Sequence, residues 1–294
     1  MRFYFKLIAG AFLVCLFVLS GLAYGDASLE IVEQFEHGRI NWSRRIVEVA
    51  GVGVVSPKLL NVNVQEARTK GIINARQAAY ANLLETIKKL QVTATQTLGD
   101  MVEKKDTIQR GLETLLHNAP VFKTDYLTDG SVTVKVRMGL DGELAQLILP
   151  DEITQLESIN ISNEQHKSDQ EAAYTGMIVD ARGLIFKPAM LLKLVDERNQ
   201  EVYGPKYASR ECAVRWGFCE YTDQIDSAKT FKRLGNNPIM VRGLRIKTPG
   251  SSTIVISDTD VSKIRSNAAH LVFLKKCRVV IVLDGASGKP ESKK

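Results

Sequence analysis

The stretch Thr128-Asp129-Gly130-Ser131-Val132-Thr133-Val134-Lys135-Val136-Arg137-Met138 carries the clearest structural signal in this chain of 294 residues. From Val132 to Met138, apolar residues alternate strictly with polar ones, which is the period of a strand with one buried face. Asp-Gly is a favoured hairpin turn, and residues 121–127 supply a second run on its other side. The stretch therefore predicts an antiparallel hairpin with Asp129 and Gly130 at its exposed tip.

The residues before this hairpin predict a strand and then a helix. Residues 46–55 are rich in valine and isoleucine, are interrupted by Gly51 and Gly53, and end before Pro57, as a strand with a closely packed end would. Asn63 is a good N-cap with Glu66 three residues on, and apolar residues then recur at helical spacing to Leu90. We also expect a strand over 91–98, a helix capped by Asp100 and stopped by Pro120, and a short helix over 141–149.

The C-terminal half reads as a second alternation of strands and helices. A strand over 174–179, the turn Asp180-Ala181-Arg182-Gly183 and a return strand over 184–195 come first. Asn199-Gln200 is expected to make another turn, followed by a strand over 213–221 and a helix over 226–234. A hairpin around Pro249-Gly250, a helix capped by Ser257-Asp258 and a strand ending at Leu283 complete the chain.

These elements predict an α+β protein of two small domains, each a mainly antiparallel sheet with helices packed on one face. The first domain is expected over 41–150 and the second over 174–284. Residues 26–40 form a lead-in arm, the polar stretch 151–173 a linker, and the Gly, Ser, Pro and Lys-rich residues 285–294 a disordered tail.

The first 25 residues have the layout of a secretory signal peptide. Arg2 and Lys6 precede an apolar run over 7–19, and Ala23-Tyr24-Gly25 offers small residues for cleavage. The run is shorter than the roughly 20 residues of a membrane span, which favours a cleaved signal over the alternative, a retained anchor. The chain is therefore expected in the periplasm, with an association to the outer membrane that is at most peripheral or through a partner.

Charge argues against nucleic acid as a partner. The net charge of +6 falls to +4 when Arg2 and Lys6 leave with the signal, because 6 − 2 = 4 and no acidic residue is lost. The remaining basic residues are scattered among acidic ones instead of forming the single-signed stripe that nucleic-acid binding needs.

The cysteines allow one disulfide. Cys212 and Cys219 are close in sequence, and an oxidising compartment permits a bridge between them, although two reduced, partly buried thiols fit the same spacing. Cys277 opens an apolar run and is expected to be a packed thiol.

Catalytic and cofactor motifs are missing from the sequence. Gly51-Val52-Gly53 lacks the third glycine of a dinucleotide fingerprint, and the four histidines stand apart from any ligand at zinc spacing. No nucleophile elbow or phosphate-binding loop is found. We therefore predict a protein that is not an enzyme and uses no cofactor. The polar pair Asp180 and Arg182 reads first as a side-chain-capped turn.

Several stretches resemble a known family. These are Ile40-Asn41-Trp42, Gly51-Val52-Gly53, Ala75-Arg76-Gln77-Ala78-Ala79, and Asp129-Gly130-Ser131-Val132 with Val136-Arg137-Met138. Residues 41–149 resemble the small membrane-associated bacterial lipoprotein family that shares its domain with the N-terminal part of flagellar assembly protein T. Tyr174-Thr175-Gly176, residues 179–184 and Cys277-Arg278-Val279-Val280 look like the second half that accompanies this domain in some envelope proteins.

The resemblance implies a non-enzymatic envelope protein, often tied to the outer membrane, with links to flagellar basal-body or other surface-structure assembly. A lipoprotein needs a cysteine at the cleavage site, whereas Asp26 stands at the expected mature start. Membrane association would therefore come through a partner.

The leading functional hypothesis is a scaffold or assembly factor that binds other cell-envelope proteins, including flagellar or outer-membrane components. The alternatives are a periplasmic ligand-binding module with a cleft between its domains and, third, a cell-wall hydrolase with clustered carboxylates. Asp129, Gly130, Asp180 and Arg182 are the candidate interaction surface.

Overall fold

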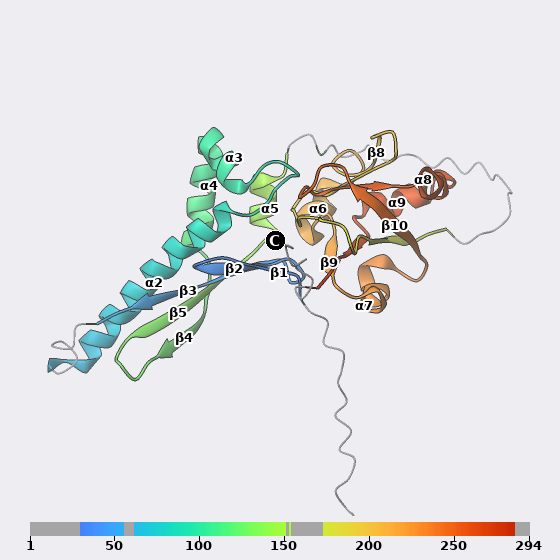
Figure 1. Cartoon of the computed structure of the whole chain (residues 1–294). Coiled ribbons are helices and arrows are strands. Elements are labelled where there is room, and N and C mark those ends of the chain that lie inside the picture. Colours follow the sequence, from blue (N-terminus) through green and yellow to red (C-terminus); the bar gives the residue numbers. More distant parts are fainter. Residues whose placement is uncertain (1–29, 56–61, 151–152, 154–172, 286–294) are drawn as a thin grey trace, which may run out of the picture.

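The computed structural model describes residues 30–55, 62–150, 153 and 173–285, which form two α+β units, each built on its own sheet (Figure 1). This confirms the predicted α+β class. The predicted signal peptide, nearly all of the predicted linker and tail, and the first residues of the predicted arm lie outside the described residues.

The first unit is a five-stranded antiparallel sheet of order β1-β2-β3-β5-β4. Its strands are β1 (Val32–Gln34), β2 (Gly38–Asn41), β3 (Ile46–Gly53), β4 (Val121–Tyr126) and β5 (Val132–Gly139). Its helices are α2 (Val64–Lys88), α3 (Leu98–Lys104), α4 (Asp106–His117) and α5 (Glu143–Ile148). The hairpin β4–β5 confirms the strongest local prediction.

Helix α2 lies along the sheet because its capping and its small residues allow a close approach. The Asn63 side chain accepts a hydrogen bond from the backbone N–H of Glu66 at 3.1 Å, as predicted for the cap. A Cβ on Gly51 would overlap the backbone of Ala75 and Ala79. The two glycines of β3 thus serve close helix–sheet packing, the interpretation that the sequence favoured over a nucleotide site.

The second unit is a seven-stranded sheet of order β8-β7-β11-β10-β6-β12-β9. Its strands are β6 (Gly176–Asp180), β7 (Lys193–Val195), β8 (Glu201–Tyr203), β9 (Glu220–Thr222), β10 (Pro238–Ile246), β11 (Thr253–Ile256) and β12 (Val279–Val282). Its helices are α6 (Arg210–Trp216), α7 (Ile225–Thr230), the short 3₁₀ turn η1 (Lys232–Leu234), α8 (Asp258–Arg265) and α9 (His270–Lys275).

This second sheet corrects the expected antiparallel arrangement. Strand β6 pairs in parallel with β10 and β12, β12 with β9, and β11 with β7, so four of the six strand pairs in this sheet are parallel. Helices cover both faces: Ile178, Val280 and Val282 pack against α7 and η1, while Met177, Val179 and Ile281 face the main core. Burial on both faces explains the continuous apolar run of β12, a pattern typical of parallel strands.

Three other predicted strands and the predicted lead-in arm were wrong. Residues 91–98 form one isolated bridge, Gln91 to Thr97, because Thr97 caps α3 and the carbonyls of Gln91 and Val92 accept hydrogen bonds from the second unit. The expected return strand over 184–195 is reduced to β7. Residues 213–221 begin inside helix α6, which stops at Gly217, where φ is +72°. The supposed lead-in arm carries β1 and most of β2, so the sheet begins before Asn41.

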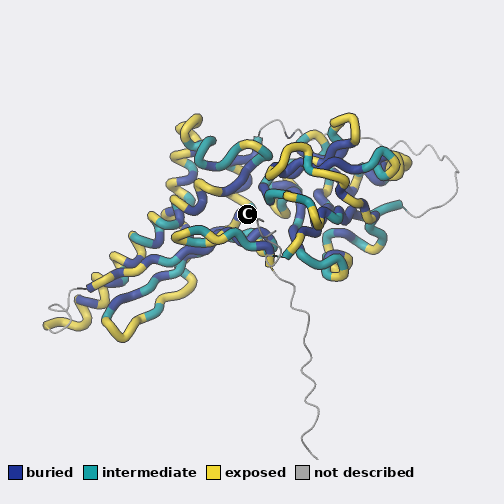
Figure 2. The backbone as a smooth tube through the Cα atoms, viewed as in Figure 1, coloured by how far each residue is buried: buried dark blue, intermediate teal, exposed yellow. Residues whose placement is uncertain are grey.

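Most buried residues of the two units belong to one hydrophobic core, and Figure 2 shows buried segments in both units. Trp42 of the first unit meets Tyr221 of the second edge to face, with ring centroids 5.9 Å apart. Both side chains are nearly fully buried. The two units therefore share one hydrophobic core across their junction.

Candidate interaction surface

The first unit projects away from the junction and ends in a group of exposed apolar side chains. Helix α2 has 25 residues, which corresponds to a length of about 37 Å. Strand β3, the start of α2 and the turn of the β4–β5 hairpin all meet at the far end, where Gly53 and Tyr126 both pair with Val132. We call this far end the distal end (Figure 1).

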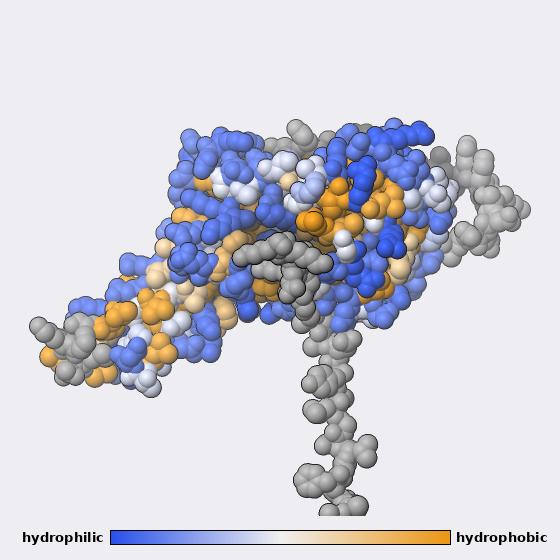
Figure 3. All heavy atoms as spheres, viewed as in Figure 1, coloured by the Kyte–Doolittle hydropathy of each residue, from blue (hydrophilic) through white to orange (hydrophobic). Residues whose placement is uncertain are grey.

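The apolar side chains of the distal end are 47% to 85% exposed. They are Val52, Val54, Val62, Val64, Tyr126 and Leu127. In Figure 3, hydrophobic atoms at this end of the molecule stand among hydrophilic ones. Arg68 of α2 lies over the Tyr126 ring at 5.8 Å, so the group has a cationic border. These side chains lie on both faces of the sheet at this end: Val52 points away from α2, whereas Tyr126 lies on the α2 side beside Arg68. Exposed apolar groups gathered at one end of a molecule can mark a site of protein contact.

The predicted residues Asp129 and Gly130 belong to this end. Asp129 Oδ1 accepts hydrogen bonds from the backbone N–H of Ser131 at 2.9 Å and from its hydroxyl at 2.7 Å. Those bonds hold the pKa of Asp129 below its usual value. Gly130 has φ +85°. Both residues therefore shape the turn that presents Tyr126 and Leu127.

Sequence reasoning missed the valines around them, although a signal was present. Because Val47, Val49, Gly51 and Gly53 face α2, alternation along β3 places Val52 on the opposite face, and Val54 continues the same outward pattern. Outward-facing valines at the end of a strand were the available clue.

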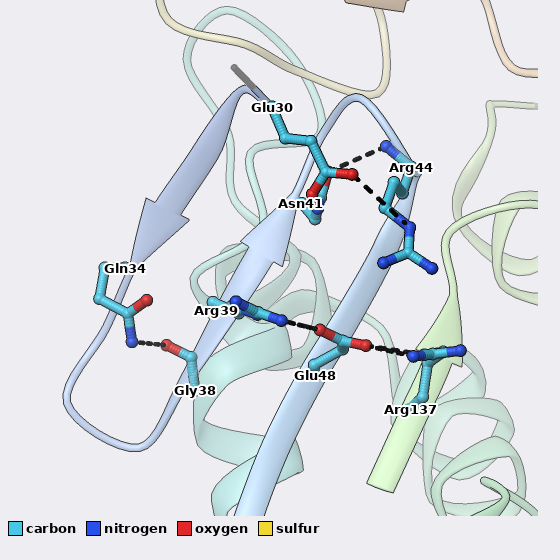
Figure 4. Close-up of polar contacts among 8 residues, drawn as sticks. All are labelled: Glu30, Gln34, Gly38, Arg39, Asn41, Arg44, Glu48 and Arg137. Carbon is cyan, nitrogen blue, oxygen red and sulfur yellow. Dashed lines mark hydrogen bonds and ion pairs between the residues drawn. The ribbon is translucent and has the colours of Figure 1, made fainter. Parts of the chain in front are cut away.

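The outer face of the same sheet carries an ion-pair network instead of a helix contact. The carboxylate of Glu48, which is only 7% exposed, forms ion pairs with Arg39 of β2 and Arg137 of β5 (Figure 4). The nitrogen–oxygen distance is 2.6 Å in both pairs. Burial raises the pKa of Glu48, but hydrogen bonds from both arginines outweigh it and hold the pKa below its usual value. Nearby, Glu30 pairs with Asn41 and Arg44. The network joins three strands and stiffens the projecting unit.

The centre of the junction between the units is packed and leaves little room for a ligand. The cavity beside Trp42, Leu140, Phe218 and Tyr221 has a volume of about 20 Å³, room for one water molecule. Arg210 donates to the carbonyls of Pro150 at 2.9 Å and Gln146 at 3.0 Å. The packed centre argues against a deep ligand cleft through the middle of the junction, and it holds the two units in a fixed relation.

A shallower pocket of about 390 Å³ lies at the rim of the junction, lined by Arg45, Trp216, Glu220, Phe231 and Arg233 among others. Arg45 and Arg233 both donate to the Trp216 carbonyl, and Arg45 also pairs with Asp141 at 2.9 Å. Burial raises the pKa of Asp141, with Arg45 opposing that rise. The pocket combines cations with aromatic surface.

The other predicted pair, Asp180 and Arg182, lies in the second unit, at the carboxyl end of β6. Arg182 donates from Nε and Nη2 to the Asp180 carboxylate, each at 2.8 Å, and these bonds lower the pKa of Asp180. Gly183 N donates to Asp284 at 2.7 Å. The pair caps a turn, as its composition indicated, and it belongs to a different sheet from Asp129 and Gly130.

The three described cysteines, Cys212, Cys219 and Cys277, carry free thiols. The bridge between Cys212 and Cys219 is therefore not formed in this structure. Burial raises the pKa of Cys219 to about 11 and that of Cys277 to about 12. Thiols held so firmly in the protonated form are weak nucleophiles.

Within the described residues, no three His, Cys, Asp or Glu side chains come together in a way that could hold a metal ion. No helix in the described part of the chain is both long and apolar enough to cross a bilayer.

The fold and the surface define a two-unit α+β protein with a projecting first unit. Comparison with protein families places a match on the second unit: residues 176–285 match the family described as Treponema pallidum Tp0624, second domain. The match begins at the first residue of β6 and extends past β12, so it includes the whole seven-stranded sheet. No curated protein matched the chain.

Proposed function

We propose that the protein is a non-enzymatic scaffold or assembly factor of the periplasm that binds other cell-envelope proteins through the distal end of its first unit. The observation that carries the proposal is the group of exposed apolar side chains at the end of a stiff projection, opposite the packed junction. An apolar surface at the end of the projecting first unit is suited to bind a partner protein at a fixed position relative to the second unit.

The setting of this function rests on the sequence. The signal-like start supports export to the periplasm. The resemblance of residues 41–149 to the domain of flagellar assembly protein T supports a partner in the flagellar basal body or another surface structure. Outer-membrane association would then come through that partner.

The test is site-specific cross-linking in the native cell. A photo-reactive amino acid replaces Leu127 at the distal end in one strain and Gln77, exposed on α2, in a matched control strain. We expect adducts with another envelope protein from position 127, identified by mass spectrometry, and none of the same mass from position 77.

A second variant separates binding from folding. Leu127→Asp keeps the backbone hydrogen bond from residue 127 to Ser131 and should leave the unfolding midpoint unchanged while abolishing co-purification of the adduct partner. Equal adducts from both positions, or a partner retained by Leu127→Asp, would overturn the proposal.

The second candidate function is a periplasmic ligand-binding module, and the pocket at the rim of the junction favours it. The rings of Trp216 and Phe231 line it together with Lys232 and two arginines. Arg45 pairs with Asp141 and Arg233 with Glu220, so Lys232 is the cation that is left for a small carboxylate or phosphate with an apolar portion. Tryptophan fluorescence titration with a small-anion library, compared between the wild type and Trp216→Phe, would decide this alternative.

A further inference from the structure

A large groove crosses the second unit where the two units adjoin. Its volume is about 1070 Å³, at the upper end of what small-molecule sites occupy. The floor includes Leu191, Val195 and Thr253, and the rim includes Thr93 and Thr95 from the first unit. A groove of this size suits a section of a polymer better than one small metabolite.

The groove is strongly cationic. Lys193, Lys206, Lys247 and Arg265 line it together with one acid, Glu201, so the balance is 4 − 1 = +3. Lys193 lies 3.9 Å from the Glu201 carboxylate, which also accepts a hydrogen bond from the backbone N–H of Lys206 at 3.1 Å. Among the described residues, none of the ion pairs within 4.0 Å involves Lys206, Lys247 or Arg265. The ammonium groups of Lys206 and Lys247 are therefore available to an anion, and Arg265, which also donates to the Glu201 carbonyl, adds a third positive charge.

The remaining polar lining is neutral and rich in hydroxyl and amide groups. Thr93, Thr95, Asn199, Gln200, Thr248 and Ser251 can donate and accept hydrogen bonds. One ring, Tyr207, lies among them. This mixture matches a chain of sugars with acidic substituents. The sugar hydroxyls can hydrogen-bond to the hydroxyl and amide side chains, and the acidic groups can pair with the cations.

A polypeptide strand fits the groove less well. The edge strand β8 would have to offer free backbone groups to an added strand. The Glu201 carbonyl instead accepts from Arg265 at 3.4 Å, and the Gly204 carbonyl beyond it accepts from the backbone N–H groups of Tyr207 and Ala208. Two carbonyls at this edge are therefore already bonded within the chain, which favours recognition by the side chains of the groove.

We propose that this groove binds an anionic glycan, with Lys206, Lys247 and Arg265 holding its acidic groups and the Thr, Ser, Asn and Gln side chains holding its hydroxyls. The site is separate from the distal end. The protein would therefore bind an acidic envelope polysaccharide in the groove while it binds a partner protein at the distal end.

The experiment is calorimetric titration of the full chain with oligogalacturonate of defined length, its neutral methyl ester, and a polyglutamate peptide of equal charge. We expect oligogalacturonate to bind, more weakly as salt rises, and both other probes to bind at least tenfold more weakly. The double variant Lys206→Glu with Lys247→Glu should lower the affinity for oligogalacturonate by roughly tenfold or more.

The matched control makes the same change in charge on the first unit, with Lys104→Glu and Lys105→Glu, and should keep wild-type affinity. Lys206→Gln with Lys247→Gln provides a milder variant if the reversal disturbs folding, and it should show a smaller loss. Equal binding of polyglutamate would make the groove an acidic-peptide site and overturn the proposal. No binding of oligogalacturonate, or an equal loss in the control variant, would also overturn it.

Discussion

Glu48 on β3 and Arg137 on β5 face each other directly across the strand pair, with Oε1 of Glu48 2.6 Å from Nη2 of Arg137. Arg39 on β2 reaches the other carboxylate oxygen at the same distance. One buried acid thus joins three neighbouring strands by charge-assisted hydrogen bonds, which are stronger than neutral ones. The exposed face of the first sheet is stiffened without a covering helix.

Replacing that acid should weaken the fold in a pH-dependent way. We expect Glu48→Gln to lower the free energy of unfolding at pH 7 by about 2 kcal/mol, because two guanidinium groups lose a charged acceptor. The pKa of Glu48 is lower in the folded chain than its ordinary value of 4.5. Its contribution is therefore full above pH 4.5 and is lost as pH falls through the folded pKa.

The measurement is urea unfolding of the wild type and Glu48→Gln from pH 7 down to pH 3. The gap between them should narrow below pH 4.5. As a control, Glu66→Gln removes an exposed pair with Lys70 and should cost well under 1 kcal/mol at any pH. A gap for Glu48→Gln that stays constant with pH would contradict the assigned role of the carboxylate.

The second prediction concerns the close contact of α2 with β3. Gly51→Ala should destabilise the protein by about 3 kcal/mol, because the new methyl group meets helix backbone, which cannot move aside like a side chain. Gly139→Ala is the matched control, since the nearest atom to its added Cβ is 4.0 Å away. Thermal unfolding of the two variants should give clearly different midpoints, and similar midpoints would show that α2 can shift away from the sheet.

Local patterns in the sequence predicted much of the first unit. The alternation from Val132 to Met138 and the Asn63 cap each depend on neighbours within a few residues, and both are confirmed. The second sheet was harder because β6 pairs with β10 and β12, strands more than fifty residues away along the chain. Parallel pairing leaves no turn signature, so the sequence near Asp180 predicted a local hairpin instead.

The candidate surfaces likewise contain some residues that local sequence patterns predicted and others that they did not. The exposed turn at Asp129 and Gly130 was predictable because the residue preferences that define a turn lie in consecutive positions of the sequence. The distal end also needs Val62, which precedes the Asn63 cap, and Val64, the first residue of α2. The cationic groove gathers Lys193, Lys247 and Arg265 from separate parts of the chain. Only the folded chain brings such residues together, since the sequence shows no periodic relation among them.

The third prediction concerns the chemical reactivity of the cysteine thiols. At pH 8, iodoacetamide should modify Cys212, which is partly exposed, much faster than Cys219 or Cys277. Burial keeps the pKa of those two thiols at about 11 and about 12, so they stay protonated and screened from the reagent. Mass spectrometry of peptides before and after urea unfolding gives the readout. An unlabelled Cys212 with a loss of two hydrogens would instead show the disulfide to Cys219.

The fourth prediction concerns the shared core at the junction. Trp42 is 1% exposed, packs on Tyr221 and donates from Nε1 to Glu33 at 3.1 Å. Trp42→Ala should therefore lower the free energy of unfolding by about 4 kcal/mol and loosen the contact between the units. Trp216, which is 50% exposed, provides the matched control, because its ring contributes a contact with Arg215 and little burial.

Urea unfolding and limited proteolysis together test this role. We expect Trp42→Ala to become sensitive to cleavage between the units under conditions where the wild type and Trp216→Ala resist it. The reason is that the first unit is held through this core and the hydrogen bonds around it, so losing its largest side chain lets the two units separate before either sheet unfolds. If Trp42→Ala instead lost both sheets in one step with no such intermediate, the two units would form a single cooperative domain, and the junction would be as stable as the sheets themselves.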